Sequence, residues 1–359
     1  MDKIKVAVIG LGLMGQSQVR NCFDKSEDFE VVAVCDNYRP HLDSIKDYFD
    51  QTGRNVETYT DYKDMLNECD MDLVAIVTPD FLHEEMALAC LEKRRHLRLE
   101  KPMAITIDGC KRIQEAAKKA GTVVQIGLEL RYADVIEKIR NNINEIGDVK
   151  LLWCHEFRHP LLKKEGSIPD WIISRKYSGG TLLEKNCHHF DLFNMFAGAK
   201  PVTVYASGDN QVEYKHTDIL DNAFVTVEYE NGVRAMLALC LFAPPKNGQR
   251  HMPHLEFGLL GSKGRIDMRD DELFIWDRAG KSEMHYTYIR NNYEAHCEDI
   301  NLSLKDLAKC IREGTQPLTD IHAGLNSIIV AVAAEISVAE KRIVYIKELE
   351  QKYKVSYKI

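Results

Sequence analysis

Residues 4–15 read IKVAVIGLGLMG, and this stretch decides the fold of the first half of the chain. The continuous apolar run 4–9 is typical of a strand that is buried on both faces of a sheet. Gly10, Gly12 and Gly15 follow it directly and precede a helix-like segment. They allow, in order, a tight turn, a close approach of the backbone to a pyrophosphate, and close packing of the helix on the strand. The stretch therefore predicts a phosphate-binding turn between a strand and a helix.

Strand-like and helix-like segments alternate through the first third of the chain. Strands are expected at 4–9, 31–35, 73–77, 96–99 and 123–126, and helices after residue 14 and at 41–49, 84–92 and 108–120. Apolar strands joined by helices predict a doubly wound parallel sheet. We therefore expect an α/β chain with an N-terminal Rossmann domain at residues 1–126.

The pattern changes after residue 126. One amphipathic helix is expected, followed by strand-like runs between 149 and 288 and by two helices at 294–312 and 323–340. Asn231-Gly232 separates two of the runs and predicts a hairpin whose two central residues both have a positive φ. We expect a second α/β domain at 127–359 with a large, open, mostly antiparallel sheet, and terminal helices that pack back toward the first domain.

Composition and charge limit the partners of the chain. Its 359 residues carry a formal net charge of -8 and no long basic run, so nucleic acid is not an expected partner. The longest apolar stretch, 325–338, contains Glu335, and no charged leader precedes the strand at residue 4. We therefore expect neither a membrane span nor a secretion signal. Ten cysteines without a CxxC pair indicate reduced thiols and a cytoplasmic protein.

Asp36 ends the second expected strand. A carboxylate there can accept both hydroxyls of an adenosine ribose, and it repels a 2′-phosphate, which favours NAD over NADP as the cofactor. Arg39, three residues later, could pair with that phosphate instead. Alternatively, the glycines form an ordinary turn and Asp36 caps a helix; the strand-turn-helix order favours dinucleotide binding.

Two further segments carry candidate chemistry. Lys101 follows the strand that ends at residue 99, at the sheet edge where doubly wound folds bind ligands, and its ammonium can hydrogen-bond a reacting hydroxyl or carbonyl. Glu184 and His188 are four residues apart. A helix would place them on one face, where the carboxylate supports an imidazole suited to removing a hydroxyl proton.

Both segments can also be explained by ordinary structural roles. Lys101 can be a surface lysine beside a turn proline, and His188 a hydrogen-bonded core residue. A third interpretation is a metal site, whose ligands would be Glu184, Cys187, His188, His189 and Asp191. That set lacks a recognised ligand spacing, so no metal is expected.

The order of these motifs resembles the Gfo/Idh/MocA family (glucose-fructose oxidoreductase and inositol dehydrogenase) over nearly the whole chain. The shared features are the strand with GLGLMG, Asp36, Thr78-Pro79 with His83, Glu100-Lys101-Pro102, a glycine pair that leads to an acid, a histidine and Asp191, and Pro317-Leu318-Thr319-Asp320 before a long apolar helix. The resemblance implies Lys101 and His188 as the catalytic pair. Glu184 stands where the family more often has aspartate, and Asn186 where it more often has glycine.

The resemblance also implies the binding residues. Expected cofactor contacts are Gly10, Gly12, Leu13, Met14, Gly15, Asp36, Thr78, Pro79, His83, Glu100 and Lys101. Expected substrate contacts are Lys101, His188, Trp171 and Arg175, since tryptophan can stack on a sugar face and arginine can bind hydroxyls. His189 is extra relative to the family pattern and is expected as a further substrate contact.

The implied activity is NAD-dependent hydride exchange with a hydroxyl-bearing carbon of a sugar, a cyclic polyol such as an inositol, or a glycoside. The open sheet of relatives often mediates oligomer contacts, so a homo-oligomer, a dimer or tetramer, is expected. Two alternatives are a glycosidase that uses transient oxidation with retained NAD, and a non-catalytic NAD or sugar sensor.

Overall fold

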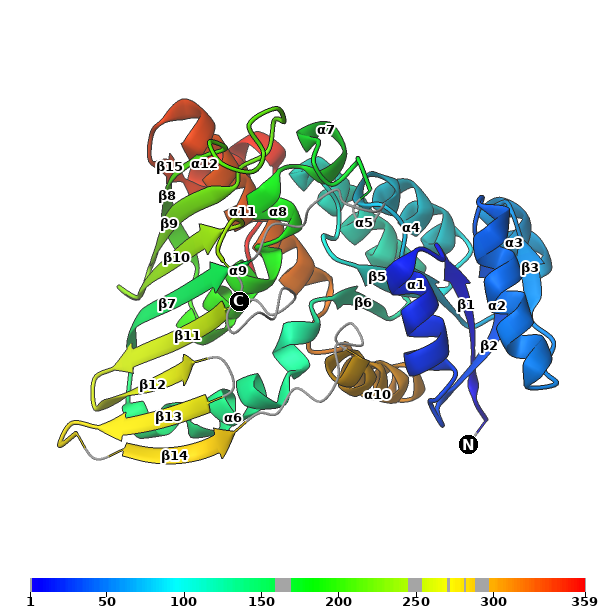
Figure 1. The fold of residues 1–359 in the computed structure, drawn as a ribbon, viewed down its shortest axis with the longest axis horizontal. Coiled ribbons are helices and arrows are strands. Elements are labelled where there is room, and N and C mark those ends of the chain that lie inside the picture. Colours follow the sequence, from blue (N-terminus) through cyan, green and yellow to red (C-terminus); the bar gives the residue numbers. More distant parts are fainter. Residues whose placement is uncertain are drawn as a thin grey trace. The chain divides into compact units, whose positions relative to one another are not determined.

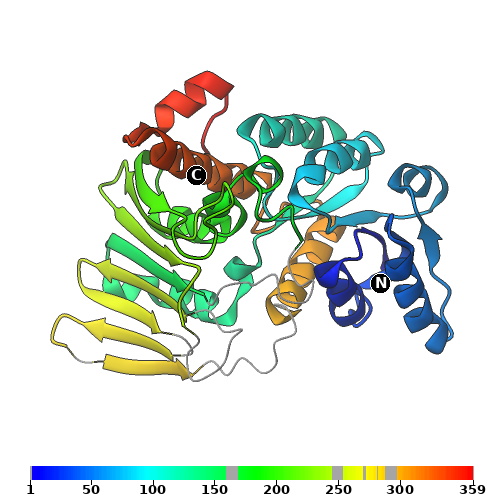
Figure 2. The same cartoon turned by 45° about the horizontal axis from the view of Figure 1, so that its top comes forward.

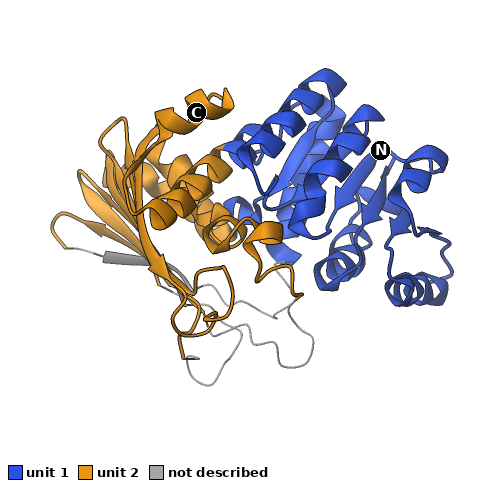
Figure 3. Ribbon diagram, turned by 90° about the horizontal axis from the view of Figure 1, so that it is seen from above, with its two compact units in different colours: residues 1–133, 292–325 blue, residues 134–291, 326–359 orange. Residues whose placement is uncertain are grey.

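The computed structural model describes residues 2–158, 169–244, 254–269, 272–280, 282–287 and 297–358. The chain divides into two compact units (Figure 3): unit 1 is Met1–Ala133 with Asn292–Leu325, and unit 2 is Asp134–Asn291 with Asn326–Ile359. The described residues form a six-stranded sheet in unit 1 and a nine-stranded sheet in unit 2. The expected fold class, a Rossmann sheet and a mostly antiparallel second sheet, is confirmed.

The units differ from the expected division after residue 126. Unit 1 continues to Ala133 and includes 292–325. The reason is α10 (Cys297–Glu313), which places Ile300, Leu304 and Leu307 in the apolar core of the six-stranded sheet. Residue 288 of the expected strand region and residues 294–296 of the expected helix lie outside the described residues.

Unit 1 is built from parallel strands and helices that alternate along the chain (Figure 1). Its strands are β1 (Ile4–Ile9), β2 (Phe29–Cys35), β3 (Glu57–Tyr59), β4 (Leu73–Ile76), β5 (His96–Glu100) and β6 (Val124–Gly127). Besides α10, its helices are α1 (Leu13–Ser17), the π-helical η1 (Gln18–Phe23), α2 (Arg39–Gln51), α3 (Tyr62–Glu68), α4 (His83–Glu92) and α5 (Ile107–Ala120), with 3-10 turns η2 (Asp80–Leu82) and η3 (Glu129–Tyr132).

The strand order of unit 1, β3-β2-β1-β4-β5-β6, makes the connections run in opposite directions from β1. Ligands of doubly wound folds bind where the strand order reverses, beyond the carboxyl ends of the strands. In this chain that place lies at the ends of β1 and β4. Helices cover both faces of the sheet (Figure 3). Phe23, Leu42, Phe49 and Leu304 belong to one apolar cluster, so η1, α2 and α10 form one of the two layers.

Local signals in the sequence fix several helix ends in unit 1. The side chain of Asp61 accepts the backbone N–H of Lys63 at the start of α3, and Thr106 accepts that of Gly109 at 3.0 Å at the start of α5. Gly121, with a φ of +69°, ends α5. The expected helix that stops at this glycine is confirmed.

Unit 2 is a nine-stranded sheet with helices (Figure 1). Its strands are β7 (Val149–Phe157), β8 (Pro201–Asp209), β9 (Asn222–Tyr229), β10 (Arg234–Cys240), β11 (His254–Gly261), β12 (Gly264–Arg269), β13 (Glu272–Asp277), β14 (Ser282–Thr287) and β15 (Val344–Tyr345), in the order β14-β13-β12-β11-β7-β10-β9-β8-β15. Its helices are α6 (Asp134–Asn142), the 3-10 turn η4 (Ile143–Ile146), α7 (Arg175–Ser178), α8 (Thr181–Glu184), α9 (Cys187–Ala197), α11 (Ile321–Glu340), whose residues up to Leu325 are grouped with unit 1, and α12 (Ile346–Tyr353). β7 and β10 pair in parallel, and the other described pairs are antiparallel.

One face of this sheet is covered by helices of the same unit (Figure 2). The hydroxyl of Tyr229 on β9 donates to the side chain of Asn194 on α9 at 3.0 Å. The backbone N–H of Ala206 on β8 donates to the Ser337 hydroxyl on α11 at 2.8 Å. Residues of β9 alternate between buried and exposed along the strand, as expected when one face packs on a core.

The expected hairpin at Asn231-Gly232 joins β9 and β10, but the predicted turn type is wrong. Gly232 has a φ of +81°, whereas Asn231 does not have a positive φ. The backbone N–H of Gly232 donates to the carbonyl of Tyr229, and that of Tyr229 donates to Val233, both at 2.9 Å. This pattern is typical of a three-residue loop. The Asn231 side chain, which donates to the Ala197 carbonyl at 2.8 Å, ties this loop to the end of α9.

Among the described helices, α11 is long and apolar enough to cross a membrane by length and composition alone. However, 72% of its most apolar window is buried inside the structure. Such burial is typical of a core helix in a globular unit.

Candidate active site

The turn after β1 has a shape that requires glycine at two positions. Gly10 has a φ of +92°, and a Cβ there would lie 2.5 Å from the carbonyl oxygen of Val77, in the loop after β4. A Cβ on Gly15 would lie 1.9 Å from the carbonyl oxygen of Gly10. A Cβ on Gly12 would meet no atom within 4 Å, so the backbone there faces open space. These residues fit a dinucleotide whose pyrophosphate lies against the turn.

The carboxylate of Asp36, beyond the end of β2, lies beside this turn. One of its oxygens accepts the backbone N–H of Leu11 at 2.6 Å, and the other accepts that of Tyr38 at 2.8 Å. The imidazole Nδ1 of His41 lies 3.2 Å from the first oxygen. The side chain of Asp36 is 11% exposed, so the carboxylate is held in one place with limited access for a ribose.

Other side chains near the turn differ in their surroundings. Leu13 is 83% exposed, whereas Met14 packs partly against the apolar core. The guanidinium of Arg39 lies 3.0 Å from the Asp43 carboxylate, and both side chains are exposed. The charge of Arg39 is therefore already neutralised by Asp43, one turn further along α2.

His83 connects the loops that follow β4 and β5. Its ring nitrogens lie 3.0 Å from the carbonyl oxygen of Thr78 and 2.7 Å from that of Pro102. The side chain is fully buried, and burial lowers its pKa, which favours the neutral ring. His83 therefore has a structural role, in which its ring connects the two loops. The hydroxyl of Thr78 is buried and has no hydrogen-bond partner within the described part of the chain.

Glu100 and Lys101 form the carboxyl end of β5 and the residue after it. The amide of Gln18, on η1, donates to a carboxylate oxygen of Glu100 at 2.7 Å. The other oxygen lies 3.3 Å from the backbone N–H of Lys101. A Cβ on Gly127, on β6, would lie 2.7 Å from the carboxylate, so Glu100 fills the space that this glycine leaves. Lys101 is half-buried. Gln18 was not predicted as a site residue, because it is one polar residue among many on a helix.

In unit 2, the segment from Gly179 to His189 folds as two short helices and not as the single helix that would place Glu184 and His188 on one face. Gly179 and Gly180 have φ values of +77° and +110°, and they start α8. α8 ends at Glu184 and α9 begins at Cys187. The intervening Asn186, with a φ of -101° and a ψ of 3°, interrupts the helical geometry.

Accessibility within this segment is confined to two side chains. Of residues 181–190, Lys185 and His188 are half-buried, and the others are buried. Lys185 Nζ lies 2.8 Å from a carboxylate oxygen of Glu184, which is 6% exposed. His188 is therefore the more accessible of the two imidazoles in this segment.

His189 belongs to a buried polar cluster that the sequence did not predict. Its Nδ1 lies 3.2 Å from the amide nitrogen of Asn186 and 3.4 Å from the carboxylate of Glu156 on β7. Asn186 donates to the same carboxylate at 2.6 Å, and the Arg158 guanidinium pairs with its other oxygen. Burial opposes ionisation of Glu156, but Arg158 and the other donors lower its pKa to about 2. Burial lowers the pKa of His189, which favours a neutral ring.

The expected substrate residues Trp171 and Arg175 lie in different environments. Trp171 is half-buried in the turn before α7. The guanidinium of Arg175 pairs with the carboxylate of Glu335 on α11, which is 4% exposed. The same carboxylate accepts the backbone N–H of Leu182 at 2.8 Å. Arg175 therefore helps to hold the start of α8.

No group of three or more His, Cys, Asp or Glu side chains that could hold a metal ion occurs within the described residues. The histidines and acids of residues 184–191 instead pair with other groups, as Lys185 with Glu184 and His189 with Glu156 show.

Comparison with known proteins places these features in one family. The NAD-binding Rossmann fold of the GFO_IDH_MocA oxidoreductase family matches residues 4–128, and the C-terminal alpha/beta domain of that family matches residues 137–347. The scyllo-inositol 2-dehydrogenase (NAD(+)) of Bacillus subtilis is 26% identical over 347 residues, which cover 92% of this chain and 93% of that protein. The myo-inositol 2-dehydrogenase of Thermotoga maritima is 24% identical over 354 residues, with 96% and 99% covered.

A solved structure shows the same fold. An oxidoreductase from Agrobacterium radiobacter, in complex with NAD+, L-tartaric acid and magnesium, superposes with a TM-score of 0.85 over 97% of this chain and 100% of its own, at 16% identity. Together with the glycine turn beside Asp36 and the matches to both domains, this shows that the chain belongs to the Gfo/Idh/MocA family of NAD-binding oxidoreductases.

Proposed function

We propose that this protein is an NAD-dependent dehydrogenase that exchanges hydride with a hydroxyl-bearing carbon of a cyclic polyol or sugar. The observation that carries the proposal is the fixed Asp36 carboxylate beside a glycine turn with open space over Gly12. The names of full-length relatives, which are inositol 2-dehydrogenases, support the substrate class.

Lys101 and His188 are the proposed proton-transfer and polarising pair. NAD, when bound, supplies a hydride acceptor at the nicotinamide C4. The Lys101 ammonium donates a hydrogen bond to the reacting oxygen, and His188 takes the hydroxyl proton as the C–H bond breaks and the carbonyl forms. The substrate thus loses a hydride and a proton. Glu184, which is buried and already paired with Lys185, fixes the segment that carries His188.

Trp171 is the proposed substrate-binding residue in addition to the catalytic pair, and His189, which is 3% exposed, is proposed as a more deeply placed contact. A half-buried indole can stack on the apolar face of a ring, and a neutral imidazole held by Asn186 and Glu156 can bind a hydroxyl. Arg175 is the weaker candidate, because its guanidinium is paired with Glu335.

NAD is the proposed cofactor, and NADP the less favoured one. The Asp36 carboxylate would repel a 2′-phosphate, and Arg39 is already paired with Asp43. The remaining proposed contacts of the dinucleotide are Gly10, Gly12, Leu13, Met14, Gly15, Thr78, Pro79, Glu100 and Lys101.

The experiment is a turnover assay with NAD and a panel of inositols, sugars and glycosides, in which absorbance reports reduced nicotinamide. A dehydrogenase accumulates NADH, a glycosidase with retained NAD cleaves glycosides without net NADH, and a sensor does neither. Lys101→Ala should lower kcat by at least ~10²-fold and leave NAD affinity nearly unchanged. The control is Lys119→Ala, an exposed lysine on α5. Full activity of Lys101→Ala would remove the catalytic assignment.

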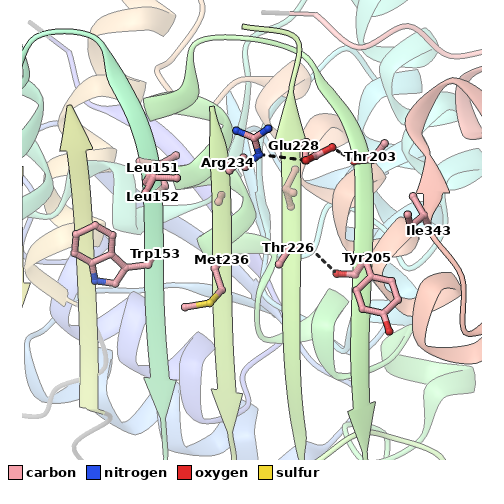
Figure 4. Close-up of a pocket in the computed structure, with 12 residues that line it drawn as sticks. Leu151, Leu152, Trp153, Thr203, Tyr205, Thr226, Glu228, Arg234, Met236 and Ile343 are labelled. Atoms are coloured by element: carbon pink, nitrogen blue, oxygen red, sulfur yellow. Dashed lines mark hydrogen bonds and ion pairs between the residues drawn. The ribbon is translucent and has the colours of Figure 1, made fainter. Parts of the chain in front are cut away.

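We also propose that the protein is a cytoplasmic homo-oligomer that buries the open face of the nine-stranded sheet. Figure 4 shows Trp153, Met236, Thr226 and Tyr205 side by side on neighbouring strands, in agreement with their pairing registers. The indole of Trp153 lies over Gly258 on β11, where a Cβ would be 2.0 Å from the ring. The row lines a hollow of about 630 Å³.

A second copy of the chain is the proposed occupant of this face. Exposed apolar side chains, among them Phe224 at 65% and Tyr205 at 46%, lie on the same sheet face as the ion pair of Arg234 and Glu228, which offers both charges to an identical partner. Light scattering should report a smaller assembly for Phe224→Glu than for Val212→Glu, a loop residue that is 50% exposed. Equal masses for the two variants would contradict this interface.

A further inference from the structure

Arg98 is an arginine in the middle of a buried parallel strand. It lies on β5 and is 1% exposed, which is rare for this residue type. One terminal nitrogen donates to the side-chain oxygen of Gln125 at 2.6 Å and to the Ser303 hydroxyl at 3.1 Å. Gln125 is its registered neighbour on β6. The Nε of Arg98 has no hydrogen-bond partner among the described residues.

The guanidinium of Arg98 forms an ion pair with the carboxylate of Glu100. The two residues are two positions apart on one strand, so their side chains lie on the same face of the sheet. The other terminal nitrogen of Arg98 lies 3.5 Å from a carboxylate oxygen of Glu100. The same oxygen accepts the Gln18 amide at 2.7 Å. One carboxylate oxygen is thus in an ion pair with a cation from the sheet and accepts one hydrogen bond from the helix that follows the glycine turn.

Gln18 reaches Glu100 from an unusual helical turn. α1 continues without a break into the π-helical segment η1, which begins at Gln18. π-helical turns are rare and are found mostly at functional sites. Gln18 is fully buried, although glutamine is usually exposed. The glycine turn is therefore connected through one helix and one hydrogen bond to the residue before Lys101.

The position of Glu100 in turn sets the backbone at Lys101. Its second oxygen lies 3.3 Å from the Lys101 backbone N–H, and the carboxylate occupies the space that the missing side chain of Gly127 leaves on β6. Burying an arginine with an unsatisfied Nε costs stability, and apolar residues of similar volume would often be as stable. A purely structural role therefore accounts poorly for Arg98.

We infer that Arg98 and Gln18 are positioning residues, which hold the Glu100 carboxylate and thereby aim Lys101 at the bound substrate. The role presupposes the proposed function, in which Lys101 acts on the reacting oxygen. The pair also couples the dinucleotide turn to Lys101, so the geometry of Lys101 depends on the helix that starts at the turn.

The test compares Arg98→Met and Gln18→Met with Tyr132→Phe. Tyr132 belongs to the same buried network, where its hydroxyl donates to Asp306 at 2.6 Å and receives the Gln125 amide at 3.3 Å, but it does not contact Glu100 in the described structure. We expect Arg98→Met and Gln18→Met to lower kcat by ~10- to 100-fold. Arg98→Lys, which keeps the charge, should recover part of the rate. Tyr132→Phe should lose thermal stability and keep its kcat.

A second readout does not depend on turnover. The rate at which trinitrobenzenesulfonate modifies Lys101, measured by peptide mass spectrometry, should change several-fold in Arg98→Met and Gln18→Met, while that of Lys119 stays constant. If the unchanged protein oxidises no polyol, the proposed function fails. The labelling rate of Lys101 then still tests whether Arg98 and Gln18 position Lys101. Unchanged labelling and kcat in Gln18→Met, or an equal loss of kcat in Tyr132→Phe, would overturn it.

Discussion

The carboxylate of Glu335 accepts the backbone N–H of Leu182 at 2.8 Å. This contact connects the core helix α11 to the first turn of α8, two residues before Glu184 and six before His188. A Cβ on Gly180 would lie 2.5 Å from the same carboxylate oxygen, and Gly180 has a φ of +110°. Gly180, the second residue of the glycine pair, is therefore required by a buried acid that is distant along the chain.

Gly180→Ala should be far more harmful than another glycine replacement at positive φ. Gly198 also has a positive φ, +56°, but a Cβ there would meet no atom within 4 Å. Gly198→Ala should therefore show the backbone cost alone, about 1–3 kcal/mol in the free energy of unfolding. Gly180→Ala should lose a further ~1–3 kcal/mol from the clash. Urea unfolding of both variants is the measurement, and equal losses would contradict the contact.

Gly180→Ala should also lower kcat at a temperature where it is still folded, because the clash displaces the segment that carries His188. NAD affinity should not change, since the dinucleotide turn is in the other unit. A lowered NAD affinity with an unchanged kcat would count against this placement of the catalytic segment.

Arg175 provides a second test of the same contact. Burial raises the pKa of the Glu335 carboxyl, and the Arg175 guanidinium opposes that shift. Arg175→Met leaves a buried carboxylate without its cation, which typically costs ~3–5 kcal/mol. The double variant Arg175→Met with Glu335→Gln removes the unpaired charge and keeps an acceptor for Leu182. It should regain most of the stability.

The kinetics of the double variant separate the two roles of Arg175. If Arg175 only holds α8, the double variant should regain the KM for polyol together with the stability. If the stability returns but KM stays raised, Arg175 binds substrate directly, as the family resemblance implies.

The fold could be predicted from sequence wherever one local pattern was sufficient. The apolar run 4–9 and the three glycines predicted β1 and the turn after it, and Gly121 predicted the end of α5. β3 and α3 were not predicted, because β3 has three residues and α3 buries only Met65 and Leu66. Their stability comes from neighbouring elements rather than from a repeating pattern of their own.

The sequence allowed us to propose the residues that carry the chemistry of the candidate site. It did not allow us to predict the residues that hold them in position. Glu184, Lys101 and His188 belong to short motifs, so they can be recognised from the sequence alone. Gln18 and Glu335 act through contacts that join positions 82 and 153 residues apart, and no local pattern identifies the partner of either residue. The condition under which Glu184 and His188 would share a helix face is not met, since Asn186 interrupts the helical geometry and its side chain donates to Glu156.

Cofactor preference should depend on the charge of Asp36. Asp36→Asn keeps an acceptor beside the turn but removes the negative charge that opposes a 2′-phosphate. We expect the ratio of kcat/KM for NADP to that for NAD to rise by about tenfold or more, which corresponds to at least ~1.4 kcal/mol. Arg39→Ala is the control: it should leave the ratio unchanged, because Arg39 is paired with Asp43. If Arg39→Ala abolishes NADP use, Arg39 binds the phosphate.

Stability should fall as the pH drops below about 6.5, the ordinary pKa of histidine. Burial lowers the pKa of His83 in unit 1 and of His189 in unit 2. The unfolded chain therefore takes up protons that the folded chain does not bind. Each imidazole then costs its unit up to about 1.4 kcal/mol per pH unit, until its lower folded-state pKa is reached. Glu156 acts in a separate window: its contribution is present above about pH 4.3 and is lost as the pH falls toward its folded pKa of about 2.

Urea unfolding at several pH values between 8 and 5 tests the histidine window. His189→Gln should flatten the pH dependence of unit 2, because glutamine has no proton to gain. His216→Gln, at an exposed position, should leave it as in the unchanged protein. The carboxylate window remains in both variants, since Arg158 still pairs with Glu156. A wild-type stability that does not change between pH 7 and 5.5 would contradict the lowered pKa of His189, in which burial outweighs the opposing effect of the Glu156 carboxylate.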